Sequence, residues 1–207
     1  MLPIAHRIDP VVITKITVGG ARVQAGRFVK PSSVARDPLT PFDAGDDWIQ
    51  NLSIHLFNRT TKTIVAVDVN LGFLDTGNAA QPPRGRVLNL GRLPDPASFD
   101  RTGRFRAQPP GRLPLDFGPG GTMVVALGDY IDGIRSTLAL DMPPAAVAHL
   151  RIDVICSYFA DGVRFGGGGY SEPDPQNPGK WRSKDRAYSP GFVDASWPGR
   201  PGWVDQE

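Results

Sequence analysis

The sequence predicts an all-β fold, an antiparallel β-sandwich, on three observations. About seven short segments rich in β-branched and apolar residues are separated by turn residues. Glycine (24) and proline (21) are abundant among the 207 residues, which suits turns and irregular connections and argues against a helical bundle. The order of the segments shows no alternation of strands and helices. A closed barrel fits the same segments and is the lesser alternative.

The first two strands are expected at residues 11–18 and 22–29, joined by the turn residues Gly19 and Gly20. The first of them, "VVITKITV", is rich in β-branched residues, which favour extended backbone. A long proline-rich loop follows at residues 30–46, where residues that precede proline cannot continue a regular helix.

The clearest pattern is a pair of strands at residues 52–56 and 65–73. In each, apolar residues alternate with polar ones, which predicts strands with one buried face. The letters "NRTTK" between them supply turn residues. We therefore expect the two segments to pair as one half-buried antiparallel hairpin.

A second long loop is expected at residues 76–112, which are polar and contain one short apolar run at 87–90. Strands are expected again at 113–117 and 122–127, with the turn letters "GPGG" between them. The segment "GDYIDGIRSTLAL" predicts a short helix, although Gly133 weakens it.

The last long strand is expected at residues 150–158. Its alternation places Cys156 on the apolar face, where a buried, unreactive thiol is the usual outcome. Asp161 and Gly162 then predict a tight hairpin onto residues 163–165, because Asp-Gly accepts the positive φ of such turns. These segments make residues 1–165 the predicted β-sandwich domain.

Residues 166–207 are predicted to be an extended C-terminal strap. The run Gly166–Gly169 resembles a phosphate-binding loop only in composition, since the prolines that follow preclude the necessary helix, and a flexible exit from the last strand is expected instead. The strap is unusually aromatic for a disordered tail. Its candidate partner-binding side chains are Tyr170, Trp181, Tyr188, Phe192, Trp197 and Trp203. Three alternatives stay open: the strap packs on its own domain, docks on another subunit, or is free.

The residues that could carry chemistry form no recognisable motif. The histidines His6, His55 and His149 lack metal-ligand spacing, and no second cysteine accompanies Cys156. Carboxylates gather at Asp43, Asp46 and Asp47 and again at Glu172 and Asp174, where calcium is an alternative to simple turn residues. The sequons at Asn51 and Asn58 are interpreted as chance occurrences. We expect no cofactor, no catalytic residue and no metal.

Charge and hydropathy limit the kinds of partner. The formal net charge is +2, which leaves no basic footprint for nucleic acid. No apolar run is long enough to span a membrane, so membrane association would come only through partners. The opening letters "MLPIAHRIDP" lack the apolar centre of a signal peptide.

Three segments resemble bacterial extracytoplasmic immunoglobulin-like domains: "DDWIQNLSIHLFNRTTKTIVAVDVNL", "GPGGTMVVAL" and "IDVICSYFADGVRFGGGGYSEPDPQNPGKW". The last is similar to the ending of uncharacterised secreted proteins common in acidobacteria and related phyla. The resemblance implies an immunoglobulin-like fold, a periplasmic or cell-surface location and no catalytic residues.

These observations lead us to expect a non-catalytic structural or accessory subunit that contacts other protein subunits in an envelope or membrane-associated assembly, or that self-assembles. A carbohydrate-binding module is the alternative, because aromatic side chains on a β-sandwich can stack on sugar rings. An enzyme whose site converges from distant loops is a third reading.

Overall fold

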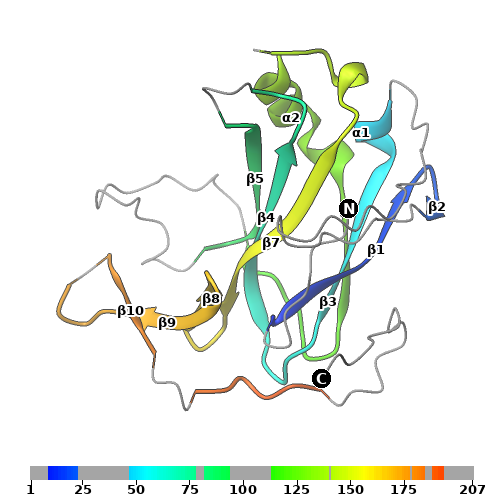
Figure 1. The fold of residues 1–207 in the computed structure, drawn as a ribbon. Coiled ribbons are helices and arrows are strands. Elements are labelled where there is room, and N and C mark those ends of the chain that lie inside the picture. Colours follow the sequence, from blue (N-terminus) through cyan, green and yellow to red (C-terminus); the bar gives the residue numbers. More distant parts are fainter. Residues whose placement is uncertain are drawn as a thin grey trace, which may run out of the picture.

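A computed structural model describes residues 9–22, 47–77, 82–93, 113–139, 141–177, 179–184 and 188–193. This part of the chain is mostly β, as predicted, and its strands form two antiparallel sheets (Figure 1). Short helices gather at one end of the sheets, and the C-terminal strands lie toward the other end.

The smaller sheet has the strand order β2-β1-β3-β6. Its members are β1 (Val11–Val18), β2 (Ala21–Arg22), β3 (Leu52–Asn58) and β6 (Thr122–Ala126). The expected N-terminal hairpin is present as far as the described residues extend: Thr17 pairs with Arg22 and Val18 with Ala21 across Gly19 and Gly20. Residues 23–29 and the predicted loop 30–46 lie outside the described residues.

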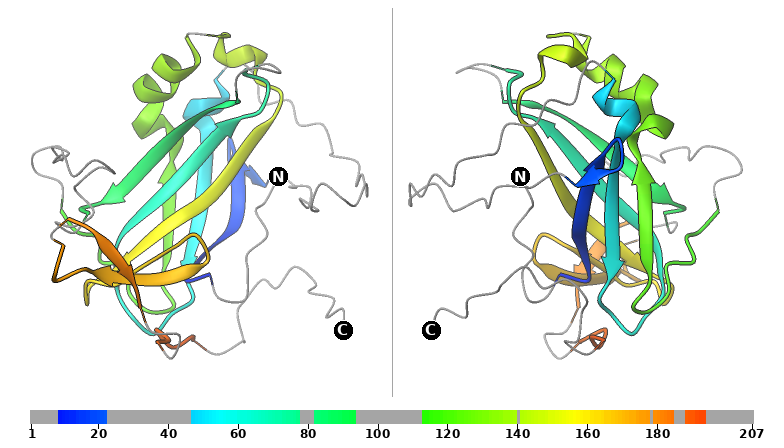
Figure 2. Two further views of the ribbon diagram at one scale, coloured as in Figure 1. Left: turned by 60° about the vertical axis from the view of Figure 1, so that its left-hand side comes forward. Right: turned by 90° about the vertical axis from the view of Figure 1, so that its right-hand side faces the viewer.

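The larger sheet has the strand order β10-β9-β8-β7-β4-β5. Its members are β4 (Ile64–Phe73), β5 (Arg84–Gly91), β7 (Leu150–Phe159), β8 (Arg164–Gly166), β9 (Gly169–Pro173) and β10 (Trp181–Ser183). One view in Figure 2 has the yellow β7 in front, and the other has the blue β1 in front.

The short helices are α1 (Trp48–Asn51), the 3₁₀ turn η2 (Leu127–Tyr130), α2 (Ile131–Leu138) and the 3₁₀ turn η3 (Pro144–Ala146). The predicted helix is confirmed as η2 and α2. Gly133, which weakens it by propensity, has a packing role, because a Cβ there would lie 2.7 Å from a guanidinium nitrogen of Arg86 on β5. Glycine therefore leaves room for the end of the Arg86 side chain against α2.

Both sheets contribute to one shared core. Ile54 and Leu56 of β3 and Val67, Val69 and Leu71 of β4 are all fully buried. The alternation in the sequence thus identified the buried face of both strands correctly.

The expected hairpin between residues 52–56 and 65–73 is wrong, because β3 and β4 belong to different sheets. β3 pairs with β1 and β6, whereas β4 pairs with β5 and β7. Alternation tells which face of a strand is buried and leaves its neighbour open. Here the two apolar faces meet across the core instead of lying side by side.

Residues 84–91 and 113–117 also differ from expectation. The predicted loop 76–112 contains β5, the edge strand of the larger sheet. Residues 113–117 form no strand and contact β4 through a single bridge between Phe117 and Ile64 and a hydrogen bond from Leu115 N to Val65 O (2.8 Å). The apolar run at 87–90 was the signal for β5, but arginines and prolines around it favoured a loop.

An irregularity in β7 reverses the predicted side of Cys156. The pairing of β4 with β7 shifts where Asp68 meets Cys156 and Val69 meets Val154, which leaves Ile155 as an extra residue. Phe159 then faces the core, while Cys156 and Tyr158 lie on the outer face beside Asp68. A bulge of one residue inverts the alternation beyond it.

The glycine run forms a hairpin turn and no flexible exit. Gly166 pairs with Gly169, and Gly167 and Gly168 between them have φ values of 62° and 82°. A two-residue hairpin turn whose twist matches that of its flanking strands requires a positive φ at both central residues. The expected boundary at residue 166 falls within β8, and β9 and β10 extend the same sheet. The Asp-Gly hairpin between β7 and β8 is confirmed.

Candidate functional sites

The predicted partner-binding aromatics in the described residues pack on their own domain. Tyr170 on β9 lies 4.9 Å from the ring of Phe165 and 5.1 Å from the ring of Tyr188 in an edge-on arrangement. Burial raises the pKa of the Tyr170 hydroxyl. Tyr170 and Tyr188 therefore belong to one aromatic cluster over β8 and β9.

Trp181 lies in a different cluster on the outer face of the larger sheet. The guanidinium carbon of Arg164 is 4.2 Å from the centre of the indole, and the ring of Tyr158 is 6.1 Å away. The Tyr158 hydroxyl donates to Asp68 (3.1 Å), whose other oxygen accepts from Asn89 (2.7 Å). Trp181 thus lies beside the Tyr158 ring, whose hydroxyl belongs to a buried polar group that no sequence motif indicated.

Residues 190–193 attach to the connection between β3 and β4 through the backbone. Thr61 N donates to Gly191 O (3.3 Å), Thr61 Oγ1 donates to Pro190 O (2.7 Å), and Val193 N donates to Arg59 O (2.7 Å). Phe192 is 37% exposed, with the Arg59 guanidinium 5.6 Å from its ring centre. This part of the tail is a strap on its own domain.

Charged side chains hold Tyr188 beside this strap. Lys62 pairs with Asp161 and also donates to the Tyr188 hydroxyl (3.1 Å). Lys184, paired with Glu172, places its ammonium group 5.3 Å from the centre of the Tyr188 ring. The hydrogen bonds to Asp161 and Tyr188 raise the pKa of Lys62. Burial alone would raise the pKa of Asp161, but the hydrogen bond from Lys62 holds it below its usual value.

The six predicted contact residues thus do not form one exposed surface. The four described ones occupy two regions of the domain. Tyr170, Tyr188 and Phe192 lie beside the β3–β4 connection, and Trp181 lies on the outer face of the larger sheet. Trp197 and Trp203 lie outside the described residues, so their part in partner binding stays a prediction.

The described histidines and the cysteine make local structural contacts. Burial and the nearby Lys15 lower the pKa of His55, which lies 3.4 Å from Thr17 Oγ1. His149 Nδ1 lies 2.7 Å from Asp75, which also accepts two backbone N–H groups, so this pair ties two connections together. Burial raises the pKa of the Cys156 thiol, which keeps it protonated at neutral pH. His6 lies outside the described residues.

The candidate calcium ligands that are described lie apart or hold protein groups. Glu172 binds Arg182 and Lys184, while Asp174 accepts from Gln176 N (2.9 Å) and Asn177 Nδ2 (2.7 Å) within its own turn. Within the described part of the chain, no three acidic, histidine or cysteine side chains cluster as metal ligands. Asp43 and Asp46 lie outside it.

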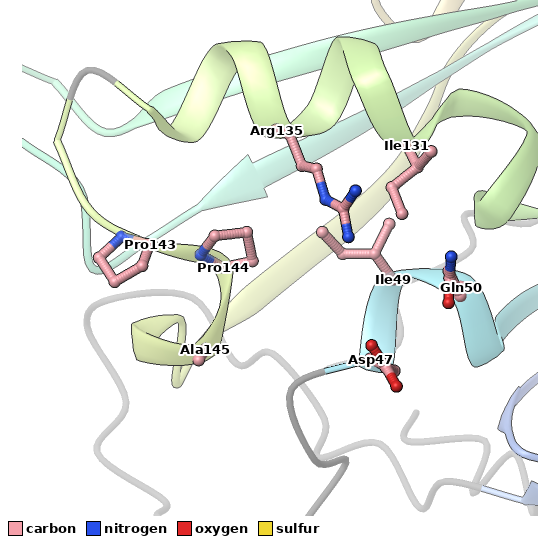
Figure 3. A pocket seen from close by; sticks show the side chains of 8 residues that line it. All are labelled: Asp47, Ile49, Gln50, Ile131, Arg135, Pro143, Pro144 and Ala145. Atoms are coloured by element: carbon pink, nitrogen blue, oxygen red, sulfur yellow. The ribbon is translucent and has the colours of Figure 1, made fainter.

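A pocket that sequence reasoning missed opens at the helical end of the molecule. It has a volume of about 300 Å³ and lies among α1, α2 and η3 (Figure 3). Its lining residues are Asp47, Ile49, Gln50, Ile131, Arg135, Pro143, Pro144 and Ala145. They come from three separate segments, so no local motif could have indicated the pocket.

A free sheet edge is the second feature that the sequence did not reveal. β6 pairs with β3 on one side, and no strand in the described ranges pairs with its other side. Its letters, "TMVVA", contain no charge or proline, and Val124 at its centre is 57% exposed. Natural proteins usually protect exposed edge strands with charges, prolines or bulges.

The register shows which amide groups face this edge. Asn58 N donates to Gly121 O (3.0 Å), and the antiparallel alternation then directs Met123 and Val125 toward β3. The backbone N–H and C=O groups of Thr122 and Val124 and the N–H of Ala126 consequently point away from β3, whereas the C=O of Ala126 begins the η2 turn. They present a short row of donors and acceptors that another strand could pair with.

No family model matches the sequence, and neither the curated proteins nor the solved structures contain a match. The resemblance to extracytoplasmic immunoglobulin-like domains therefore stays a prediction. Among the described helices, none is long and apolar enough to cross a membrane.

Proposed function

We propose that this chain is a non-catalytic immunoglobulin-like β-sandwich subunit that joins a larger assembly by accepting a strand from another polypeptide at β6. The observation that carries the proposal is the edge of β6, which has no charged residue and pairs with no strand in the described ranges. Placement of the assembly in the cell envelope rests on the sequence resemblance alone.

The strand order supports the immunoglobulin-like assignment. In chain order, β1, β3, β4, β5, β6, β7 and β8 correspond to strands A, B, C, C′, E, F and G. One sheet then has the order A-B-E and the other C′-C-F-G, with β9 and β10 added beyond G. In constant-type domains strand D covers the edge of strand E. No described strand takes the place of D here, and this is why β6 is at an edge.

An added strand would satisfy main-chain groups that no described strand pairs with. Hydrogen bonds along the edge would supply affinity, and the exposed side chain of Val124 would supply an apolar contact. Because the edge of β6 is short and has no charged residue, it does not select against either a parallel or an antiparallel incoming strand. The contact surface proposed here is β6 and not the aromatic tail that the sequence predicted, because the described tail residues already pack on their own domain.

The carbohydrate-binding alternative requires aromatic rings that lie flat and open. Arg164 covers a face of Trp181, and Tyr170 packs between Phe165 and Tyr188. Neither ring is an open platform for a sugar. Phe192, which is 37% exposed, is the described aromatic residue of the tail that stays open to this alternative, together with Trp197 and Trp203 outside the described residues.

The test compares the native assembly of three variants by mass in mild detergent. Val124→Pro removes the edge-facing N–H while leaving the β3–β6 hydrogen bonds, because proline is tolerated where the N–H faces solvent. Val124→Lys adds an edge charge without altering the backbone. The matched control Val124→Thr keeps both the amide and the branched shape.

We expect Val124→Pro and Val124→Lys to run as monomers with near-native melting temperatures, and Val124→Thr to assemble normally. Normal assembly of both disruptive variants would overturn the proposal. A native source that yields only the 22.3 kDa monomer of the unaltered chain would also overturn it.

A further inference from the structure

We propose that the pocket among α1, α2 and η3 binds a carboxylate carried on a short aliphatic chain. This site is separate from β6 and does not depend on the proposed assembly. The ligand chemistry follows from three properties of the pocket: its apolar walls, a guanidinium that pairs with no described carboxylate, and a framework that is already fixed.

The walls are largely apolar. Ile49 from α1, Ile131 from α2, and Pro143 and Pro144 before and in η3 face the space shown in Figure 3. A volume of about 300 Å³ is at the lower end of small-molecule sites, so it suits a ligand with a few carbon atoms. An aliphatic group would leave water for these walls, whereas a strongly polar ligand such as a sugar would lose hydrogen bonds there.

Arg135 supplies the charge that selects an anion. In Figure 3 its guanidinium projects from α2 toward Ile49, between Ile131 and Pro144. The side chain is exposed, and no carboxylate among the described residues forms an ion pair with it. By contrast, Arg84 binds Asp141 and Arg182 binds Glu172. A guanidinium beside apolar walls fits a carboxylate, which it can bind through two parallel hydrogen bonds.

The pocket is held in place by buried contacts beneath it. Trp48 Nε1 donates to Pro144 O (2.9 Å), which joins α1 to η3. Ile134 and Leu138 anchor α2 in the core and are fully buried. A Cβ at Gly128 would lie 3.4 Å from Gln50 O, so α1 and η2 are closely packed. Binding therefore requires little ordering of the protein, which preserves the affinity of a small ligand.

Asp47 adds a limit on the ligand's charge. Its carboxyl group lines the same pocket and lies across Ile49 from Arg135 in Figure 3. A second carboxylate on the ligand would be repelled by Asp47. The site should therefore prefer monocarboxylates to dicarboxylates of the same length.

The test titrates the full chain with isocaproate and with the neutral isocaproamide, following backbone amide NMR signals. We expect isocaproate to shift signals of α1, α2 and η3 with a dissociation constant on the order of 1 mM, and isocaproamide to bind at least about tenfold more weakly. Adipate, the dicarboxylate probe, should also bind more weakly.

Three variants locate the site. Arg135→Gln should weaken isocaproate binding about tenfold or more, whereas Arg92→Gln, the same change at another exposed arginine, should leave it unaltered. Ile131→Glu places a carboxylate one helical turn before Arg135, where the two can pair, and should abolish binding. The unchanged spectrum of β-strand amides would show that each variant is folded.

The carboxylate could belong to a peptide C-terminus or to a free acid, and a second pair of probes distinguishes these two sources. Tighter binding of glycyl-glycyl-leucine than of isocaproate would identify a peptide C-terminus as the occupant, and its amide should then fail to bind. Tighter binding of isocaproate would identify a free acid. Absence of binding by both carboxylates, equal binding of the neutral amide, or full binding by Arg135→Gln would overturn the proposal.

Discussion

Asn58 fixes the connection between the two sheets through a single buried amide group. Its Nδ2 lies 2.8 to 3.0 Å from the carbonyl oxygens of Lys62, Phe117 and Gly118, which share its two N–H groups. Its Oδ1 accepts from the backbone N–H and the hydroxyl of Thr60. One side chain thus joins the end of β3 to the segment that leads into β6.

Replacement of Asn58 by alanine should lower the free energy of unfolding by about 3 to 5 kcal/mol, because several buried donors and acceptors lose their partner together. Urea unfolding measures the loss. Asn51→Ala is the control, since Asn51 is exposed and its change should stay within about 0.5 kcal/mol. Equal stability of the two variants would refute the role assigned to Asn58.

Gly191 is required where the strap crosses the β3–β4 connection. Its φ is 68°, and a Cβ would lie 2.5 Å from Thr61 Oγ1. Gly191→Ala should therefore loosen the strap and speed hydrogen exchange of the Val193 amide about tenfold. Gly118→Ala, in open space with an ordinary φ, should leave that rate unchanged. A Val193 rate that Gly191→Ala does not alter would contradict this account.

At the scale of elements, the sequence predicted strands better than it predicted their neighbours. Alternation identified the core faces of β3 and β4, and Asp-Gly identified the β7–β8 turn, because both signals are local. The assignment of β3 and β4 to different sheets depends on contacts between distant residues such as Asn58 and Phe117. The bulge in β7 has no local signal in the sequence, so strict alternation predicts the wrong face for Cys156.

The candidate sites were less predictable than the fold for the same reason. The aromatic residues of the tail were conspicuous in composition, but their contacts with Arg164, Phe165 and Lys62 come from elsewhere in the chain. β6 is an edge strand because no described strand takes the place of strand D beside it. The pocket combines residues 47–50, 131–135 and 143–145, which only folding brings together.

The attachment of residues 190–193, the strap, should depend on pH through the paired Lys62 and Asp161. Lys62 also holds Tyr188, which comes just before the strap. The pKa of Asp161 is lowered, so its contribution is present above the ordinary carboxyl pKa of about 3.9 and is lost as the pH falls through its folded-state pKa. The pKa of Lys62 is raised, so its contribution is present below about 10.4 and is lost as the pH rises further.

We therefore expect the strap to be held most firmly between about pH 4 and pH 10. Exchange of the Val193 amide, corrected for its intrinsic pH dependence, measures the opening. In Lys62→Met the protection should be lower and its fall at acid pH should be smaller. An identical pH profile in the two proteins would show that this pair does not hold the strap.

At the scale of the whole molecule, the two ends of the domain have different properties. The end near the β3–β4 connection is closed by the strap and the Tyr188 cluster. The other end bears the pocket that Arg135 lines. Between them, no strand in the described part of the chain pairs with the outer edge of β6. We propose that protein contacts form at that edge and that a small ligand binds at the helical end.

Hydrogen exchange of the β6 amides tests the central claim most directly. In the isolated protein, Met123 and Val125 should be protected by β3, while Val124 and Ala126 should exchange rapidly at the open edge. In the native assembly, an added strand should protect Val124 and Ala126 as well. Rapid exchange of these two amides in the assembly, at the rate of the isolated chain, would contradict strand addition at β6.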